Sequence, residues 1–150
     1  MANKQFEPQE WIVAFFDKGE GFFDKFLWKG SKYRHIALFF KRKLGWYMIN
    51  PHPNYWRFEE LELMASKDFE KHIFLIKNCF CWMKVLVQEP GSPVSPLILP
   101  TCIEVVKGFM GVKCGSCISV HGFYKSLLKY DIKSNYKIIK HEVKNGRRRN

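Results

Sequence analysis

An apolar run that stops at an acidic, glycine-containing turn constrains the fold of this chain more than any other feature. It begins at residue 11 and reads WIVAFFDKGEGFF. The run over Glu10–Phe16 is too short to reveal a period, so it predicts either a buried helix or a buried strand. Gly19 and Gly21 end the element in both cases. Asp17 and Glu20 either solvate the end of this element or bind a metal ion.

The charge of the chain points to a polyanionic partner. Lys and Arg total 25 and Asp and Glu total 14 over 150 residues, which gives a formal net charge of +11. The excess is concentrated after residue 120, where nine Lys or Arg residues accompany two acidic ones and the chain ends in NGRRRN. Each phosphate that such a surface neutralises releases counterions. Together with 17% aromatic residues, this charge favours nucleic acid over the alternative of a solvated basic surface.

Other bulk features suggest where the protein works. There is no stretch of about 18 apolar residues, and the first residues, MANKQFEPQE, are polar, so we expect no membrane partner and no targeting peptide. Five cysteines, an odd number, favour a reducing compartment. The preference for Lys, Asn, Ile, Phe and Tyr is typical of AT-rich coding, which suggests a mitochondrion or another organelle and an organelle-encoded protein.

The order of elements predicts an α+β domain with an antiparallel sheet covered on one face by helices. The interval 44–100 is predicted to be a largely irregular insertion, with a proline-rich connection before residue 101. Thr101 and Glu104 form a capping box, so a helix begins there, and Gly111 ends it. The other predicted elements are strands at 22–28 and 33–43 that form a hairpin, a helical stripe at 66–80, a strand at 81–87, strands at 114–120 and 124–132, and a final helix at 134–143.

The cysteines form a weak zinc pattern. Cys114 and Cys117 are spaced as C-x-x-C, and Cys79 and Cys81 could complete four thiolates. C-x-C followed by C-x-x-C is not a standard zinc pairing, and all four residues fall in predicted strands. Burial as small apolar residues is therefore favoured over a zinc site. The histidines show no ligand spacing, and there is no phosphate-binding glycine loop or nucleophile elbow, so hydrolase interpretations have no support.

Several segments resemble the LAGLIDADG homing endonuclease family. AFFDKGEGFF, before a basic hairpin, is similar to the family's GFFDGEGSF. CIEVVKGFMGVKCGSCISV is similar to its second helix, glycine turn and third strand, and LLKYDIKSNYKIIKH to its fourth strand and closing helix. The similar segments form two blocks that together cover about 90 residues and contain no exact family signature. The resemblance is therefore a hypothesis based on motifs.

The resemblance implies a single domain over 1–150 with an αββαββα core and a saddle-shaped sheet that lies on DNA. The insertion at about 44–100 would separate its halves, and a basic tail would occupy about 144–150. Glu20 matches the metal-binding acid, with Asp17 as a further acidic candidate, and a bound Mg²⁺ would activate water. One motif requires a partner copy, so an active enzyme would be a homodimer. The residues expected to contact nucleic acid are Lys25, Lys29, Lys32, Arg34, Lys41, Arg42, Lys43, Arg147, Arg148 and Arg149.

Three departures from the family favour binding without cleavage. Lys18 lies inside the acidic turn, and the chain stops where the family continues with an active-site lysine segment. In an ungapped register Phe15 occupies a position where the family has a small residue, whereas a gapped register places Ala14 there but shifts Glu20 by one residue. The favoured hypothesis is therefore a protein that binds structured RNA in an organellar ribosome or intron ribonucleoprotein. Stacking of bases on aromatic side chains would contribute, with Phe22, Phe23, Trp28 and Tyr33 as candidates.

Two alternatives remain open. The first is an active homodimeric endonuclease that makes Mg²⁺-dependent double-strand cuts in DNA. The second is a basic α+β module unrelated to the family, which a strand at Glu10–Phe16 would support.

Overall fold

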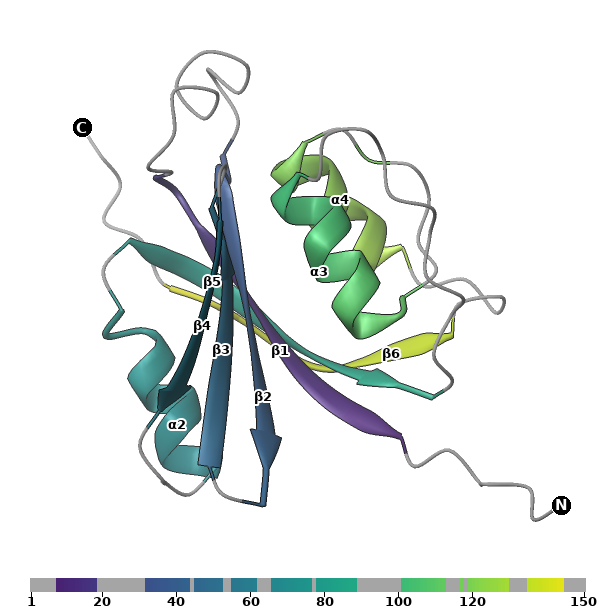
Figure 1. Cartoon of the computed structure of the whole chain (residues 1–150). Coiled ribbons are helices and arrows are strands. Elements are labelled where there is room, and N and C mark those ends of the chain that lie inside the picture. Colours follow the sequence, from purple (N-terminus) through teal and green to yellow (C-terminus); the bar gives the residue numbers. More distant parts are fainter. Residues whose placement is uncertain are drawn as a thin grey trace, which may run out of the picture.

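Six strands form one antiparallel sheet in the order β4-β3-β2-β1-β5-β6 (Figure 1). The computed structural model describes residues 8–18, 32–43, 45–52, 55–61, 66–76, 78–88, 101–112, 117, 119–129 and 135–144. The elements are β1 (Gln9–Phe16), β2 (His35–Arg42), β3 (Gly45–Pro51), β4 (Trp56–Leu61), α2 (Ser66–Ile73), β5 (Cys79–Val87), α3 (Cys102–Met110), α4 (Val120–Leu128) and β6 (Tyr136–Val143). The predicted α+β class and antiparallel sheet are confirmed.

The opening apolar run is the strand β1, which lies between β2 and β5 near the middle of the sheet. Side chains alternate between the two faces of a strand, and both faces of β1 are covered. Trp11, Val13 and Phe15 enter one core, and Ile12 and its alternate neighbours enter the other. A strand buried on both faces needs a continuous apolar run, which explains why this segment has no polar alternation. The motif helix that the family resemblance implies here is therefore wrong.

The two cores lie on opposite faces of the sheet. The helices α3 and α4 cover one face, and the helix α2 packs on the other (Figure 1). We call the first the helix-pair core and the second the α2 core. The prediction of helices on one face only is therefore wrong, because α2 contributes Phe69 and Ile73 to the second core. None of the helices in the described part of the chain is both long and apolar enough to span a membrane.

The helix start predicted at Thr101 is confirmed, with Thr101 as the N-cap. The Thr101 side chain accepts a hydrogen bond from the backbone N–H of Glu104 at 3.3 Å, and α3 begins at the next residue, Cys102. Gly111 caps the other end with φ 67°, a left-handed conformation that glycine adopts without strain. The local sequence therefore determines both ends of this helix.

Two other predictions for the last third of the chain are wrong within the described residues. Ser119 accepts a hydrogen bond from the N–H of Gly122 at 3.0 Å and caps the helix α4, which replaces the strand expected from residue 124. Most of the strand expected at 114–120 lies outside the described residues. Val120, Phe123 and Leu127 form the buried stripe of α4. The segment expected to be the final helix is the strand β6, because its backbone pairs with the outer edge of β5.

The interval 44–100 supplies β3, β4, α2 and β5, so the prediction of an irregular insertion is wrong for its described part. The strand expected at 81–87 is confirmed within β5. The helical stripe expected over 66–80 ends at Ile73, and Asn78 (φ 66°) lies in the turn before β5. The strand expected at 22–28 lies outside the described residues, and the described partners of β2 are β1 and β3.

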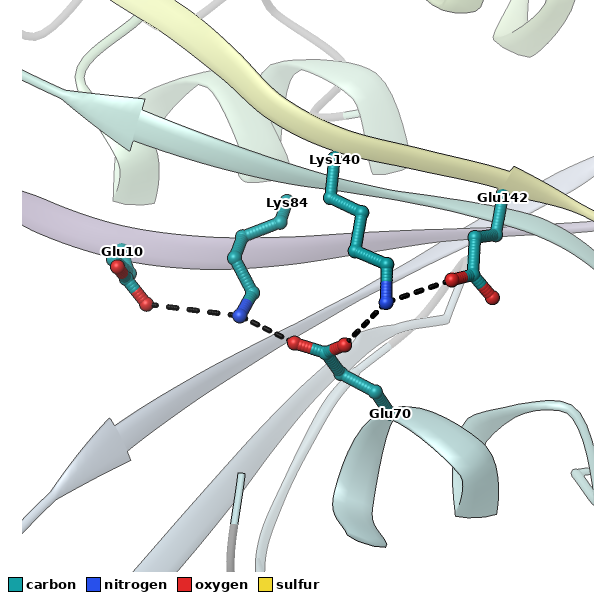
Figure 2. A network of polar contacts seen from close by, with 5 residues as sticks. All are labelled: Glu10, Glu70, Lys84, Lys140 and Glu142. Atoms are coloured by element: carbon teal, nitrogen blue, oxygen red, sulfur yellow. Dashed lines mark hydrogen bonds and ion pairs between the residues drawn. The ribbon is translucent and has the colours of Figure 1, made fainter. Parts of the chain in front are cut away.

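A network of ion pairs fastens α2 to the sheet (Figure 2). The Glu70 carboxylate on α2 contacts Lys84 of β5 and accepts a hydrogen bond from Lys140 of β6 at 2.8 Å. Lys140 also contacts Glu142 at 2.7 Å, and Lys84 lies 3.9 Å from Glu10. Burial alone would raise the pKa of Glu70, but hydrogen bonds and charges of the two lysines outweigh it and hold that pKa below its usual value. The network therefore stabilises the packing of α2 when Glu70 is ionised.

Candidate nucleic-acid interface

An open groove of about 350 Å³ lies on the helix-pair face of the sheet, across β1 to β4 and beside α3. We call it the aromatic groove. Its lining residues are Gln9, Trp11, Phe40, Arg42, Tyr47, Ile49, Phe58 and Phe109. Five of these eight side chains are aromatic, and one is cationic. The groove therefore combines stacking surface with positive charge.

Strand register places these rings beside one another. Phe40 of β2 pairs directly with Tyr47 of β3, and Ile49 of β3 pairs with Phe58 of β4, so all four side chains project from the same face. The Phe40 and Tyr47 rings are stacked, with centroids 5.5 Å apart and planes 23° from parallel. The Tyr47 and Phe58 centroids are 5.7 Å apart. The rings thus form a continuous row across three strands.

The outer part of this row is open to solvent. Trp11 and Phe40 are buried at the base of the groove, whereas Phe58 is 59% exposed and Phe109 is 43% exposed. Large apolar side chains that gather at one exposed place usually mark an interaction site. The exposed Arg42 guanidinium lies 5.7 Å from the Phe40 ring centroid, within the range of a cation–π contact. A ligand with flat rings and negative charge fits this combination.

The predicted basic residues of β2 are separated by the sheet. Lys41, Arg42 and Lys43 are all exposed at the end of β2, but only Arg42 lines the groove. Alternation places Lys41 on the opposite face. Arg34 is half-buried before β2 and donates its backbone N–H to Phe16 O at 2.9 Å. Lys32 is exposed near the other end of β1, where its ammonium lies over aromatic rings.

Other predicted residues lie in the core or outside the described residues. Tyr33 is fully buried, so its expected role in stacking on bases is wrong. Asp17 is half-buried and donates its backbone N–H to Asn78 O at 3.2 Å. The predicted residues that lie outside the described part of the chain are Glu20, Phe22, Phe23, Lys25, Trp28, Lys29, Arg147, Arg148 and Arg149.

The described residues contain no cluster of three or more His, Cys, Asp or Glu side chains that could hold a metal ion. Cys79 belongs to the α2 core and Cys81 to the helix-pair core, so the two thiols face opposite sides of the sheet and cannot share one ion. Burial raises the pKa of Cys79 to about 12 and that of Cys81 to about 11. Cys114 and Glu20 lie outside the described residues, so Mg²⁺ binding by Glu20 stays a prediction.

Sequence reasoning missed the groove because its residues come from five elements. Phe58 lies in the interval expected to be irregular, and Phe109 lies on α3, apart from the strands that supply the other rings. One signal was present: WRFEEL places a phenylalanine among charged residues, which is typical of an edge strand with one exposed ring.

No protein-family model, curated protein or solved structure matches this chain. The fold and the groove define an α+β protein with an aromatic, cationic hollow on a six-stranded antiparallel sheet.

Proposed function

We propose that this protein binds RNA and stacks unpaired bases in the aromatic groove. The observation that carries the proposal is the exposed ring of Phe58 beside Tyr47, in a groove that also presents Arg42. Stacking on an aromatic side chain contributes about 1–3 kcal/mol per base and is available to any base. Unpaired bases of a structured RNA are the nucleic-acid elements that expose such faces.

The charge of the chain supports the same ligand. A formal net charge of +11 attracts the phosphate backbone, and the Arg42 guanidinium is positioned to contact a phosphate beside a stacked base. The lining residues that the structure describes are aromatic, aliphatic, amide or cationic, a set suited to contacts with bases and phosphate. We further propose that the protein is an RNA-binding component of an organellar ribosome or of an intron ribonucleoprotein.

Replacing Phe58 with alanine should weaken RNA binding about tenfold, because one stacking surface is lost. Fluorescence anisotropy with a labelled single-stranded oligoribonucleotide measures this change. Arg42→Gln should weaken binding to all sequences and reduce the slope of log affinity against log salt by about one phosphate contact. Leu75→Ala is the control, because Leu75 is 77% exposed after α2 and outside the groove. Equal affinities of the Phe58→Ala and Leu75→Ala variants would contradict the groove as the binding site.

The resemblance to the LAGLIDADG family supports a second proposal, namely that the protein is an active homodimeric Mg²⁺-dependent DNA endonuclease. Its support is the motif AFFDKGEGFF with Glu20 as the metal ligand. The strand β1 at the position of the family's motif helix counts against it and favours an unrelated basic α+β module. The proposal that RNA binds in the groove is the same whether the chain is related to the LAGLIDADG family or is an unrelated α+β module.

The endonuclease proposal predicts sequence-specific double-strand cleavage when the protein is incubated with Mg²⁺ and DNA that spans the insertion site of its own gene. Gel electrophoresis of the products measures the cut. The cleavage should disappear in the Glu20→Gln variant, since an amide is a much weaker Mg²⁺ ligand than a carboxylate. Such a result would replace the binding-only proposal, and intact DNA would leave the endonuclease without support.

A further inference from the structure

A second group of basic and aromatic side chains lies on the helix-pair face, at the opposite end of β1 from the groove. Trp11 lines the groove, whereas Phe15 packs beneath this second group. Four residues of extended strand separate the two positions by about 13 Å. We call the group the His–Tyr cluster, and its members are Lys32, Tyr33, His121, Tyr124, Lys125 and His141.

Ring contacts hold the cluster in a defined arrangement. The fully buried Tyr33 forms its base, and the Tyr124 ring packs on it with centroids 4.7 Å apart. His121 is stacked on Tyr124, with centroids 6.0 Å apart and planes 11° from parallel. The Tyr124 hydroxyl and His141 Nε2 form a hydrogen bond of 3.2 Å. Two imidazoles from α4 and β6 therefore flank one tyrosine.

The charged side chains that act on this arrangement are cations. Lys32 Nζ lies 5.4 Å from the Tyr33 centroid and 4.8 Å from that of Phe80. Burial lowers the pKa of His121, and the positive charges of Lys125 and Lys32 lower it further. Burial also lowers the pKa of His141. Both imidazoles are therefore neutral near pH 7 and able to donate an N–H, and the two lysines place His121 in a positive field.

Lys84 and Lys107 are placed differently. Lys84 contacts the Glu70 carboxylate, and Lys107 lies 3.3 Å from Glu104. At the His–Tyr cluster the exposed Lys32 ammonium instead lies over aromatic rings. An anion that binds beside these groups is attracted by the positive charge and accepts hydrogen bonds from the N–H donors.

We propose that Lys32, His121 and His141 bind a phosphate group of the RNA whose bases stack in the aromatic groove. This inference rests on the proposed function and adds a second contact point on the same face of the sheet. The distance between the two sites corresponds to about four stacked nucleotides at about 3.4 Å each. A bound phosphate favours the protonated form of the two histidines, so RNA binding takes up protons and strengthens as the pH falls.

The groups that face the two histidines determine how this titration proceeds. Tyr33 and Tyr124 keep their protons, because burial raises the pKa of both hydroxyls. Cys81 beneath Tyr33 also stays protonated at neutral pH, since burial raises its pKa to about 11. The histidines are therefore the members of the cluster that change charge between pH 5 and pH 8.

Inorganic phosphate tests the site independently of RNA. Proton NMR of the imidazole resonances should show the pKa of His121 rising by about 0.5 or more in phosphate, compared with chloride at equal ionic strength. The Lys32→Gln variant should lose this response. Lys137→Gln removes the same charge from an exposed position on β6 and should retain it. An unchanged His121 titration in phosphate would overturn the proposal.

RNA binding provides the second measurement. Lys32→Gln should weaken RNA binding about fivefold at pH 6 and reduce the salt slope by about one phosphate contact, whereas Lys137→Gln should not. A phosphate response without RNA binding would leave the anion site standing and overturn the proposed function. RNA binding that is unaffected by Lys32→Gln would overturn the inference and leave the proposed function standing.

Discussion

Replacing Phe15 with alanine should lower the free energy of unfolding by about 4 kcal/mol. Phe15 is fully buried in the middle strand of the sheet, and its ring contacts Tyr33, Phe123 and Tyr124 at centroid distances of 5.5, 6.5 and 5.3 Å. Its removal creates a cavity where the sheet, α4 and the His–Tyr cluster meet. Urea denaturation followed by circular dichroism measures the loss.

The matched control is Phe58→Ala, which makes the same substitution at a side chain that is 59% exposed. It should change stability by less than about 1 kcal/mol, because little surface is withdrawn from water there. If Phe15→Ala does not fold, Phe15→Leu should still reveal the effect, with a loss of about 1–2 kcal/mol. Equal effects at the two positions would mean that Phe15 is not a core residue and that the β1 assignment is wrong.

Replacing Glu70 with glutamine should destabilise the protein by about 2–3 kcal/mol at pH 7, because Lys84 and Lys140 lose their shared carboxylate. The Lys84 side chain is only 14% exposed, so water replaces this partner poorly. The pKa of Glu70 is lowered in the folded state, so its contribution is complete above the unfolded value of about 4.3. The contribution is lost as the pH falls through the folded pKa.

The difference in stability between the wild type and Glu70→Gln should therefore shrink below about pH 4. Denaturant titrations at pH 7, 5, 4 and 3 measure it. Glu142→Gln is the control, since this more exposed carboxylate contacts only the Lys140 end of the network (Figure 2), and it should cost less than about 1 kcal/mol. A constant difference from pH 7 to pH 3 would show that the Glu70 charge does not stabilise the fold.

The predictions that proved correct depend on contacts between near neighbours in the sequence. The ends of α3 follow from Thr101, Glu104 and Gly111, which interact with backbone groups within one turn. The strands expected within 33–43 and at 81–87 are β2 and part of β5, because long apolar, β-branched and aromatic runs favour extended structure. The secondary structure of these segments is therefore specified by their local sequence.

The wrong predictions concern segments whose structure depends on distant partners. The sequence NYKIIKHEV fits a helix by local propensity, but β6 is extended because β5 presents an unpaired edge. The segment with Val120, Phe123 and Leu127 is a helix because Ser119 caps it and the sheet buries its stripe. Propensity differences of a few tenths of a kcal/mol per residue are smaller than the free energy of such packing.

The sequence by itself determined the α+β class, the capped helix α3 and an excess of positive charge that favours a nucleic-acid partner. The tertiary structure decided that WIVAFF is a strand, because β2 and β5 hydrogen-bond to both of its edges and cores cover both of its faces. It also decided which basic and aromatic residues share a surface. The pleat of β2 separates Arg42 from Lys41, and strand register brings Phe40, Tyr47 and Phe58 into one row. No local pattern specifies that row, since its members meet only when β2, β3 and β4 are paired.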